Sequence, residues 1–302
     1  MTALGHLPTP ANTVAPERDE GHRRGPAGYL LMIPGTVWLA LFFVLPTVTL
    51  AASSLYDPSG SLLNGYQMTW HWQNYTEALR EYAPIFLRSF LYAFAATVVC
   101  LLLGFPLAYA IAFKAGRWKN LMLVAVIAPF FTSFLVRTLS WKFLLSDNGF
   151  IVQTLSSLPA VPDDLRLLAT PFAVITGLAY NFLPFMVLPL YASLEKMDPR
   201  LLEAAGDLYA SPVNGFLRVT LPLAMPGVVA GTLLTFIPAA GDFINDELLG
   251  NPRTRMIGNT IQQLFLQAGD VATASALSVT MMVVIVLMVL VYVRKAGTED
   301  LV

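Results

Sequence analysis

Residues 271–293, VATASALSVTMMVVIVLMVLVYV, form an uncharged and mostly apolar run that ends at Arg294 and Lys295. A helix that crosses the hydrocarbon core of a bilayer needs about 20 such residues. Backbone polar groups in lipid must be satisfied within the segment, and this run is much longer than a barrel strand. We therefore expect a transmembrane α-helix here.

Five more stretches meet the same criterion: residues 29–56, 89–113, 120–141, 171–194 and 219–241. Only one of them carries a formal charge, at Arg137. The sequence thus predicts an all-α, polytopic membrane protein whose six transmembrane helices occupy residues 29–294. The flanking residues 1–28 and 295–302 are predicted to be tails, the first of them disordered because it is rich in proline, glycine and charge.

The composition excludes several other classes of protein. Of the 302 residues, 56% are hydrophobic and 12% are charged, whereas soluble domains carry about 25% charged residues. The net charge of −1 provides no basic surface for nucleic acid. A single cysteine, Cys100, rules out an intrachain disulfide, and we assign it no role beyond packing.

The distribution of lysine and arginine predicts the orientation, because cytoplasmic loops are enriched in both. If the N-terminus is cytoplasmic, the inner segments hold Arg18, Arg23, Arg24, Lys114, Arg117, Lys119, Lys196, Arg200, Arg218, Arg294 and Lys295. The outer segments then hold only Arg80, Arg88, Lys142, Arg166, Arg253 and Arg255. We expect both termini in the cytoplasm.

The loop at residues 195–226 is long and patterned. Asp198 followed by Pro199, and Ser211 followed by Pro212, are typical helix starts. They predict two short helices joined by a turn.

The first of these short helices carries like charges at Glu203 and Asp207, four residues apart, which Arg200 offsets only in part. A basic groove on a partner would relieve the pair. The alternative is a solvated face.

The loop segment EAAGDLYASPVNGFLRVTLP, residues 203–222, resembles the EAA loop of the permease subunits of binding-protein-dependent ABC importers. Val219 stands where isoleucine is usual. The residues that match the family's pattern are Glu203, Ala204, Ala205, Leu221 and Pro222.

One position departs from that pattern. Tyr209 occupies the place of the family's glycine, and a glycine appears three residues earlier, at Gly206. Glycine tolerates a positive φ, so the tightness of the turn between the short helices stays open.

Three further stretches resemble the spermidine/putrescine subgroup of these permeases: MIPGTVWLALFFVLPT (32–47), PFFTSFLVRTLSWKFLL (129–145) and FIPAAGDFINDELLGNPRTRMIGNTIQQLF (236–265). The opening of the chain is more similar to the first of the two permease subunits. The subgroup also contains permeases for other small cations and organic solutes, so those substrates remain an alternative.

The resemblance implies a multi-pass subunit of the bacterial inner membrane and three kinds of protein partner. A second permease would share the pathway, a dimer of ATP-hydrolysing subunits would bind the EAA loops, and an extracytoplasmic protein would deliver the substrate. Glu203 would pair with a basic residue of the ATPase. The residues implied in coupling to the ATPase are Glu203, Ala204, Ala205, Gly206, Asp207, Leu208, Leu221 and Pro222.

The chain lacks the residues for ATP chemistry of its own. A P-loop requires lysine followed by serine or threonine, and the five lysines precede Ala115, Asn120, Phe143, Met197 and Ala296. ATP and Mg²⁺ are thus expected on the partner subunit. We predict no catalytic residue, metal site or cofactor here, and no pairing of nucleophile and base that would suit a membrane hydrolase. A self-sufficient secondary transporter or channel is a less favoured alternative, because we find neither an internal repeat nor a carboxylate within a span.

Two places are candidates for the substrate pathway. Phe236, Asp242 and Phe243 combine a carboxylate with aromatic faces, which suits a polyamine; the alternative is that Asp242, Asp246 and Glu247 are exposed acids at a helix end. Arg137 is either a pathway or interface residue, or the third span ends early and Arg137 snorkels to the outer head groups, since Trp141 and Lys142 follow it. We favour the second interpretation, because a cation in the pathway would repel a polyamine.

Other features of the sequence indicate packing or anchoring. Gly227 and Gly231 are spaced for close helix contact. Trp70, Trp72 and Tyr75 indicate anchoring at the membrane surface, with contact to a binding protein as the alternative.

Overall fold

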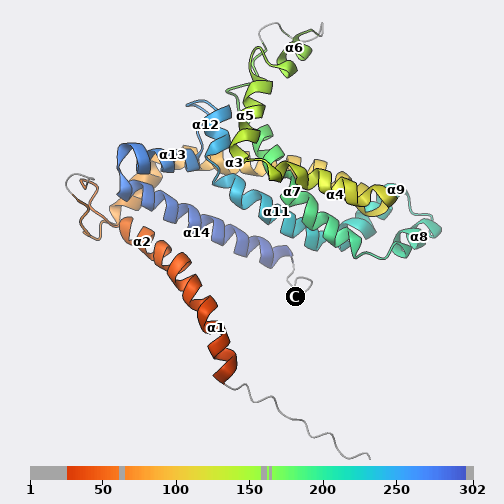
Figure 1. Cartoon of the computed structure of the whole chain (residues 1–302), viewed down its shortest axis with the longest axis horizontal. Helices are drawn as coiled ribbons and strands as arrows, with labels where there is room; N and C mark the ends of the chain where they lie inside the picture. Colours follow the sequence, from red (N-terminus) through yellow and green to blue (C-terminus); the bar gives the residue numbers. More distant parts are fainter. Residues whose placement is uncertain (1–25, 61–64, 158–161, 163–164, 297–302) are drawn as a thin grey trace, which may run out of the picture. The chain divides into compact units, whose positions relative to one another are not determined.

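The computed structural model describes residues 26–60, 65–157, 162 and 165–296 (Figure 1). The predicted tails therefore lie almost wholly outside the described residues. The described part consists of helices, turns and one isolated antiparallel bridge between Tyr56 and Met68. No β-strand occurs in it, which confirms the all-α class.

Many of the connections between helices are short, and several are π-helical or 3₁₀ turns. In chain order the helices are α1 (Pro26–Leu39), α2 (Leu45–Ser53), α3 (Gln73–Tyr109), α4 (Lys119–Ile127), α5 (Phe134–Leu145), α6 (Phe150–Ser156), α7 (Pro171–Glu195), α8 (Arg200–Asp207), α9 (Pro212–Gly215), α10 (Leu221–Leu223), α11 (Met225–Ala240), α12 (Ile244–Leu249), α13 (Ile257–Gln263) and α14 (Val271–Ala296). The two long connections precede α3 and α7.

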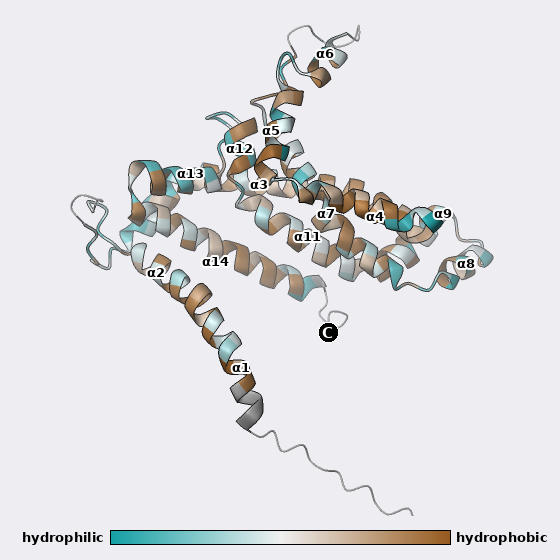
Figure 2. Cartoon of the chain, in the orientation of Figure 1, coloured by the Kyte–Doolittle hydropathy of each residue, from teal (hydrophilic) through white to brown (hydrophobic). Residues whose placement is uncertain are grey.

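Six spans emerge when bent helices are counted once. Four continuous helical segments are long and apolar enough to cross a membrane: Leu31–Ser53, Gln73–Lys114, Pro171–Glu195 and Val271–Lys295. Two more candidates are bent pairs, Gly116–Phe131 with Phe134–Ser156 at 94° and Pro212–Leu223 with Met225–Ala240 at 68°. Figure 2 shows hydrophobic residues along α14 and hydrophilic residues on α9 and α13.

The break in the third span corrects the expectation of a continuous helix over residues 120–141. Thr132 and Ser133 adopt extended backbone, with ψ values of 153° and 139°. The helix tightens into a 3₁₀ turn at Ala128–Phe131, and Thr132 Oγ1 donates to the Pro129 carbonyl at 2.8 Å. The chain then restarts as α5 in a new direction.

The second span also differs from the prediction, because α3 begins at Gln73 and not near residue 89. In this extension Glu77, Arg80 and Glu81 stay exposed while the backbone continues the helix. Hydropathy finds the apolar part of a helix and misses such an extension.

The chain divides into two compact units, Met1–Val48 and Thr49–Val302. In the first unit, none of the side chains at residues 31–44 is buried; Leu31 is 83% exposed and Phe43 is 69% exposed. Such a helix is stable only if lipid or another subunit covers its apolar side chains.

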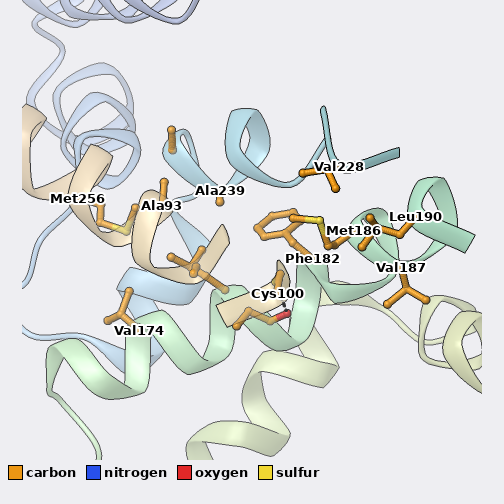
Figure 3. Packing of buried hydrophobic residues seen from close by; sticks show 14 of the residues in the cluster. Ala93, Cys100, Val174, Phe182, Met186, Val187, Leu190, Val228, Ala239 and Met256 are labelled. Carbon is orange, nitrogen blue, oxygen red and sulfur yellow. Dashed lines mark hydrogen bonds between the residues drawn. The ribbon is translucent and has the colours of Figure 1, made fainter. Parts of the chain in front are cut away.

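The second unit has a core formed by α3, α7 and α11, with α14 packed against α3. Figure 3 shows Phe182 and Met186 of α7 beside α11, and Cys100 of α3, whose Sγ donates to the Ala179 carbonyl at 3.2 Å.

The contact between α7 and α11 depends on glycine. A Cβ added at Gly227 would lie 2.7 Å from the Pro189 carbonyl oxygen, and one at Gly231 would lie 2.9 Å from Met186 Sδ. The predicted close packing at these glycines is confirmed.

Candidate functional site

The EAA-like loop, residues 195–226, forms the predicted helix–turn–helix. Asp198 Oδ1 accepts the backbone N–H of Arg200 at 3.0 Å, at the start of α8. Ser211 Oγ accepts the N–H of Asn214 at 3.3 Å, at the start of α9. Both predicted caps therefore satisfy backbone donors that have no partner inside the helix.

Helix α8 ends in a Schellman motif. The N–H of Tyr209 donates to the Gly206 carbonyl at 2.9 Å, and the N–H of Ala210 donates to the Ala205 carbonyl at 3.1 Å. Tyr209 has a φ of +57°, in the left-handed region that glycine usually occupies at this position of the motif. The tight turn thus forms with tyrosine at a cost of about 1–2 kcal/mol, while Gly206 is an ordinary helical residue.

The residues predicted to couple to an ATPase lie on an open surface. Glu203, Ala204 and Asp207 are exposed, and Leu208 is 81% exposed. Neither carboxylate forms an ion pair within the part of the chain that the structure describes. Two free carboxylates beside an exposed leucine suit a basic and apolar groove on a partner protein.

The base of this loop is tied to the core helices. Phe216 packs edge-on against Phe105 of α3, with ring centroids 5.1 Å apart. Ser193 Oγ on α7 donates to the Leu223 carbonyl at 3.5 Å. Leu221 is half-buried at this base, whereas Pro222 is exposed. The segment that follows α8 and α9 is therefore in contact with both α3 and α7.

Lys119 and Glu195 form an ion pair at the start of the loop. Lys119 Nζ lies 2.6 Å from Glu195 Oε1 and also 5.3 Å from the ring centroid of Tyr191. Both charged side chains are partly exposed, so this pair stabilises the structure only weakly.

The interpretation of Arg137 favoured from the sequence is only partly right: the third span does break before this residue, but the side chain packs inside the protein. The residue is only 8% exposed. Its guanidinium carbon lies 4.9 Å from the ring centroid of Phe130 and 5.5 Å from that of Phe134. Nε and Nη1 have no hydrogen-bond partner among the described residues. The break before α5 turns this side chain onto the rings, because Phe130 lies before the break and Arg137 after it.

A cavity of about 480 Å³ lies beside this guanidinium. Its walls include Phe130 and Phe134, Phe182 and Phe185 of α7, Arg137 and Asn181, together with apolar residues of α11. The four rings are in contact in series: centroid separations are 5.1 Å for Phe130 and Phe185, 6.2 Å for Phe185 and Phe182, and 6.0 Å for Phe182 and Phe134. We call these four residues the phenylalanine wall.

The phenylalanine wall and Asn181 were not predicted from the sequence. The one available signal was Asn181 itself, an amide within an otherwise apolar span, where polar side chains tend to be functional or paired. The rings offered no such signal, since phenylalanine is common in any span.

A buried polar network surrounds Asn181. Its Nδ2 donates to Thr138 Oγ1 and to Asn245 Oδ1, at 3.1 Å each. The backbone N–H of Asn245 in turn donates to Asp242 Oδ1 at 2.7 Å. These bonds join α5, α7 and the start of α12, and they leave Asn181 Oδ1 and Asn245 Nδ2 without a partner in the described structure.

The candidate residues Phe236, Asp242 and Phe243 have different surroundings, and none of them lines the cavity beside Arg137. Phe236 stacks on Phe90 of α3 with centroids 6.2 Å apart. Phe243 is 40% exposed, whereas Asp242 is 8% exposed and accepts a hydrogen bond from the first turn of α12. Substrate contact by these three residues remains a prediction.

The alternative that the acids after α11 are exposed is wrong for two of the three. Asp242 and Asp246 are buried, and only Glu247 is exposed. Both buried groups lie outside the segments that qualify as spans. Burial raises the pKa of Asp242 and that of Asp246 to about 6 each, against the influence of hydrogen bonds from the Asn245 and Met256 backbone N–H groups.

Arg88 fastens the segment around Asp246 to α3. Its Nε donates to the Arg255 carbonyl at 2.7 Å, and its Nη1 donates to the Arg253 carbonyl. Asp246 Oδ2 accepts the N–H of Met256 at 2.7 Å. An arginine and an aspartate thus hold the connection between α12 and α13 in place.

The sequence is similar to those of curated transport proteins. The chain is 40% identical over 260 residues to the spermidine/putrescine transport system permease protein PotB of Escherichia coli (strain K12), which covers 86% of this chain and 94% of that protein. The protein of the same name from Haemophilus influenzae is 38% identical over 258 residues, covering 85% and 90%. The inner membrane ABC transporter permease protein YdcU of Escherichia coli (strain K12) is 31% identical over 300 residues, covering 92% of each. No protein-family model matches the sequence.

The fold is similar to those of solved transporters. A chain of a bacterial ABC transporter involved in the import of the acidic polysaccharide alginate superposes with a TM-score of 0.68 and 20% identity, covering 91% of this chain and 96% of that one. A bacterial alginate ABC transporter in complex with its alginate pentasaccharide-bound periplasmic protein gives 0.62 and 19%, covering 91% and 94%. At these identities the likeness concerns the fold alone.

Proposed function

Since the chain belongs to the family of the spermidine/putrescine transport system permease protein PotB, we propose that it is a permease subunit of an ABC importer in the bacterial inner membrane whose cargo is a polyamine. The observation that carries this proposal is an identity of 40% that extends over 86% of the chain. The six candidate spans agree with it.

ATP is hydrolysed by a separate subunit in this proposal. The chain has no P-loop of its own, and α8 offers a protruding surface for docking. Glu203 pairs with a basic residue of the ATPase, and Leu208 enters an apolar part of its groove. Ties from Phe216 to Phe105 and from Ser193 to Leu223 then carry the movement into α3 and α7.

Two further partners complete the importer. A second permease forms the pathway together with this chain and covers apolar side chains that a single chain leaves exposed. An extracytoplasmic binding protein delivers the polyamine. The solved alginate transporter that resembles this chain in fold includes a periplasmic protein, which supports this arrangement by analogy.

The test is uptake of labelled spermidine by cells that express the chain with its ATPase, second permease and binding protein. We expect saturable uptake that unlabelled putrescine inhibits. Glu203→Arg is expected to abolish uptake and to release the ATPase during purification, because the substitution places like charges at the docking contact.

Glu77→Arg is the matched control. Glu77 is an exposed acid near the start of α3, far along that helix from its junction with the EAA-like loop at Phe105. This variant should keep the ATPase bound. Normal uptake by Glu203→Arg would contradict the coupling role, whereas an assembled wild-type complex without spermidine or putrescine uptake would contradict the polyamine assignment.

A further inference from the structure

The guanidinium of Arg137 is held mainly by aromatic faces. It lies 4.9 Å and 5.5 Å from the ring centroids of Phe130 and Phe134, it is 8% exposed, and its Nε and Nη1 have no acceptor among the described residues. Burying a cation without an anion is costly, and the ring faces compensate only part of that cost. The guanidinium would therefore leave the rings if a more favourable interaction became available to it.

The phenylalanine wall extends beyond the two rings that Arg137 covers. Phe182 and Phe185 continue it along α7, and the cavity of about 480 Å³ lies against all four rings. This volume is within the range of about 300–1,000 Å³ that is typical of small-molecule sites.

Asn181 lines the cavity and carries an acceptor that has no donor in the described structure. Asn181 is 1% exposed, its Nδ2 is committed to Thr138 and Asn245, and its Oδ1 has no hydrogen-bond partner in the described structure. The nearby guanidinium does not reach this oxygen. A ligand that donates N–H groups and carries positive charge would satisfy Asn181 Oδ1 and the ring faces together.

We propose that the phenylalanine wall and Asn181 Oδ1 form a subsite for an ammonium group of the transported cation, and that Arg137 occupies the wall as a tethered competitor until the substrate displaces it. This inference rests on the proposed function for the nature of the cargo. The methylene chain of a polyamine would lie on the apolar residues of α11. Arg137 then acts as a gate, because its charge repels a cation while it remains on the rings.

The experiment measures binding of labelled spermidine to the purified complex of both permeases and the ATPase, without the binding protein. Arg137→Gln removes the competing charge but keeps a side chain of similar length. We expect it to tighten spermidine binding about tenfold, which corresponds to about 1.4 kcal/mol. Arg137→Lys keeps a cation at the same position and should bind spermidine as the wild type does.

Two further variants test the subsite itself. Phe185→Leu, combined with Arg137→Gln, removes a ring that the guanidinium does not cover and should reverse most of the gain. Lys142→Gln removes the same charge from α5 outside the cavity lining and should leave binding unchanged. If Lys142→Gln tightened spermidine binding by the same factor, the proposal would be overturned, because the effect would then come from a general change in the electrostatic field of the protein.

Other outcomes would also contradict the proposed subsite. If Arg137→Gln leaves binding unchanged, or if it separates the two permeases because the guanidinium pairs with a carboxylate of the second permease, the subsite is wrong. Spermidine uptake by the wild-type importer is measured in parallel. If the wild-type importer takes up spermidine but Arg137→Gln does not tighten spermidine binding, only this inference is overturned. If an assembled importer takes up no polyamine, the proposed function is overturned as well.

Discussion

Asn181 on α7 donates a hydrogen bond of 3.1 Å to Oδ1 of Asn245 on α12. Both residues are at least 99% buried, and the same Asn181 amide donates to Thr138 on α5. Helix α5 follows the sharp break in the third span. The Asn181 amide provides one of the few polar links between α5 and the core in the described structure. The network positions Arg137, the neighbour of Thr138, against the phenylalanine wall.

Replacing Asn181 by leucine should destabilise the chain by about 1–3 kcal/mol, because Asn245 and Thr138 each lose a hydrogen-bond partner while they remain buried. The thermal unfolding midpoint of the purified importer complex measures this effect. Asn214→Leu, on the exposed helix α9, is the control and should change stability by less than about 0.5 kcal/mol. Equal midpoints for the two variants would show that the network contributes nothing to stability.

Replacing Tyr209 by glycine should stabilise the end of α8 by about 1 kcal/mol, because glycine adopts a φ of +57° without the steric cost of a Cβ. The ring is 98% exposed, so the isolated chain loses almost no packing. Hydrogen exchange of the Ala210 amide, whose bond to the Ala205 carbonyl closes the Schellman motif, should slow. Faster exchange in the glycine variant would mean that the ring stabilises the turn.

Gly227→Ala should destabilise the contact between α7 and α11 by about 1–3 kcal/mol. The new methyl group would lie 2.6 Å from Ser193 Cβ and 2.7 Å from the Pro189 carbonyl oxygen, so one helix must move. Gly206→Ala is the control, since nothing lies within 4 Å of its Cβ; it should gain up to about 1 kcal/mol of helix propensity. The thermal unfolding midpoint of the complex distinguishes the two variants. A midpoint for Gly227→Ala at or above that of the wild type would refute the close contact.

The buried carboxyl of Asp246 should make stability depend on pH. Its pKa is raised by burial from 3.8 to about 6, so the folded state binds this proton more tightly than the unfolded state does. The stabilisation from protonation is complete below pH 3.8 and is lost as the pH rises through about 6. Between these values, the unfolding midpoint of wild type should therefore fall relative to that of Asp246→Asn.

The asparagine variant suits this test because its side-chain oxygen can still accept the N–H of Met256. Asp207→Asn is the control, as Asp207 is exposed and forms no ion pair within the described residues. Its curve should run parallel to that of the wild type. If the curve of Asp246→Asn also runs parallel to that of the wild type, the Asp246 carboxyl does not titrate in this pH range.

Local patterns of residues predicted the features that depend on neighbouring positions in the chain. Runs of apolar residues required helices in a membrane, because a backbone in lipid must satisfy its own hydrogen bonds. Asp198 and Ser211 predicted where α8 and α9 begin, since a cap acts on donors two or three residues away. The glycine pair of α11 predicted a close contact, although it could not identify α7 as the partner.

The candidate subsite, in contrast, depends on how distant helices pack together. The 94° break that turns α5 aside placed Arg137 on Phe130 and Phe134, where hydropathy and flanking residues had favoured the membrane surface. Asn181 meets residues 43 and 64 positions away along the chain, and Phe185 meets Phe130 across two helical segments. Such contacts arise from how separate helices pack, and no local pattern of residues encodes them.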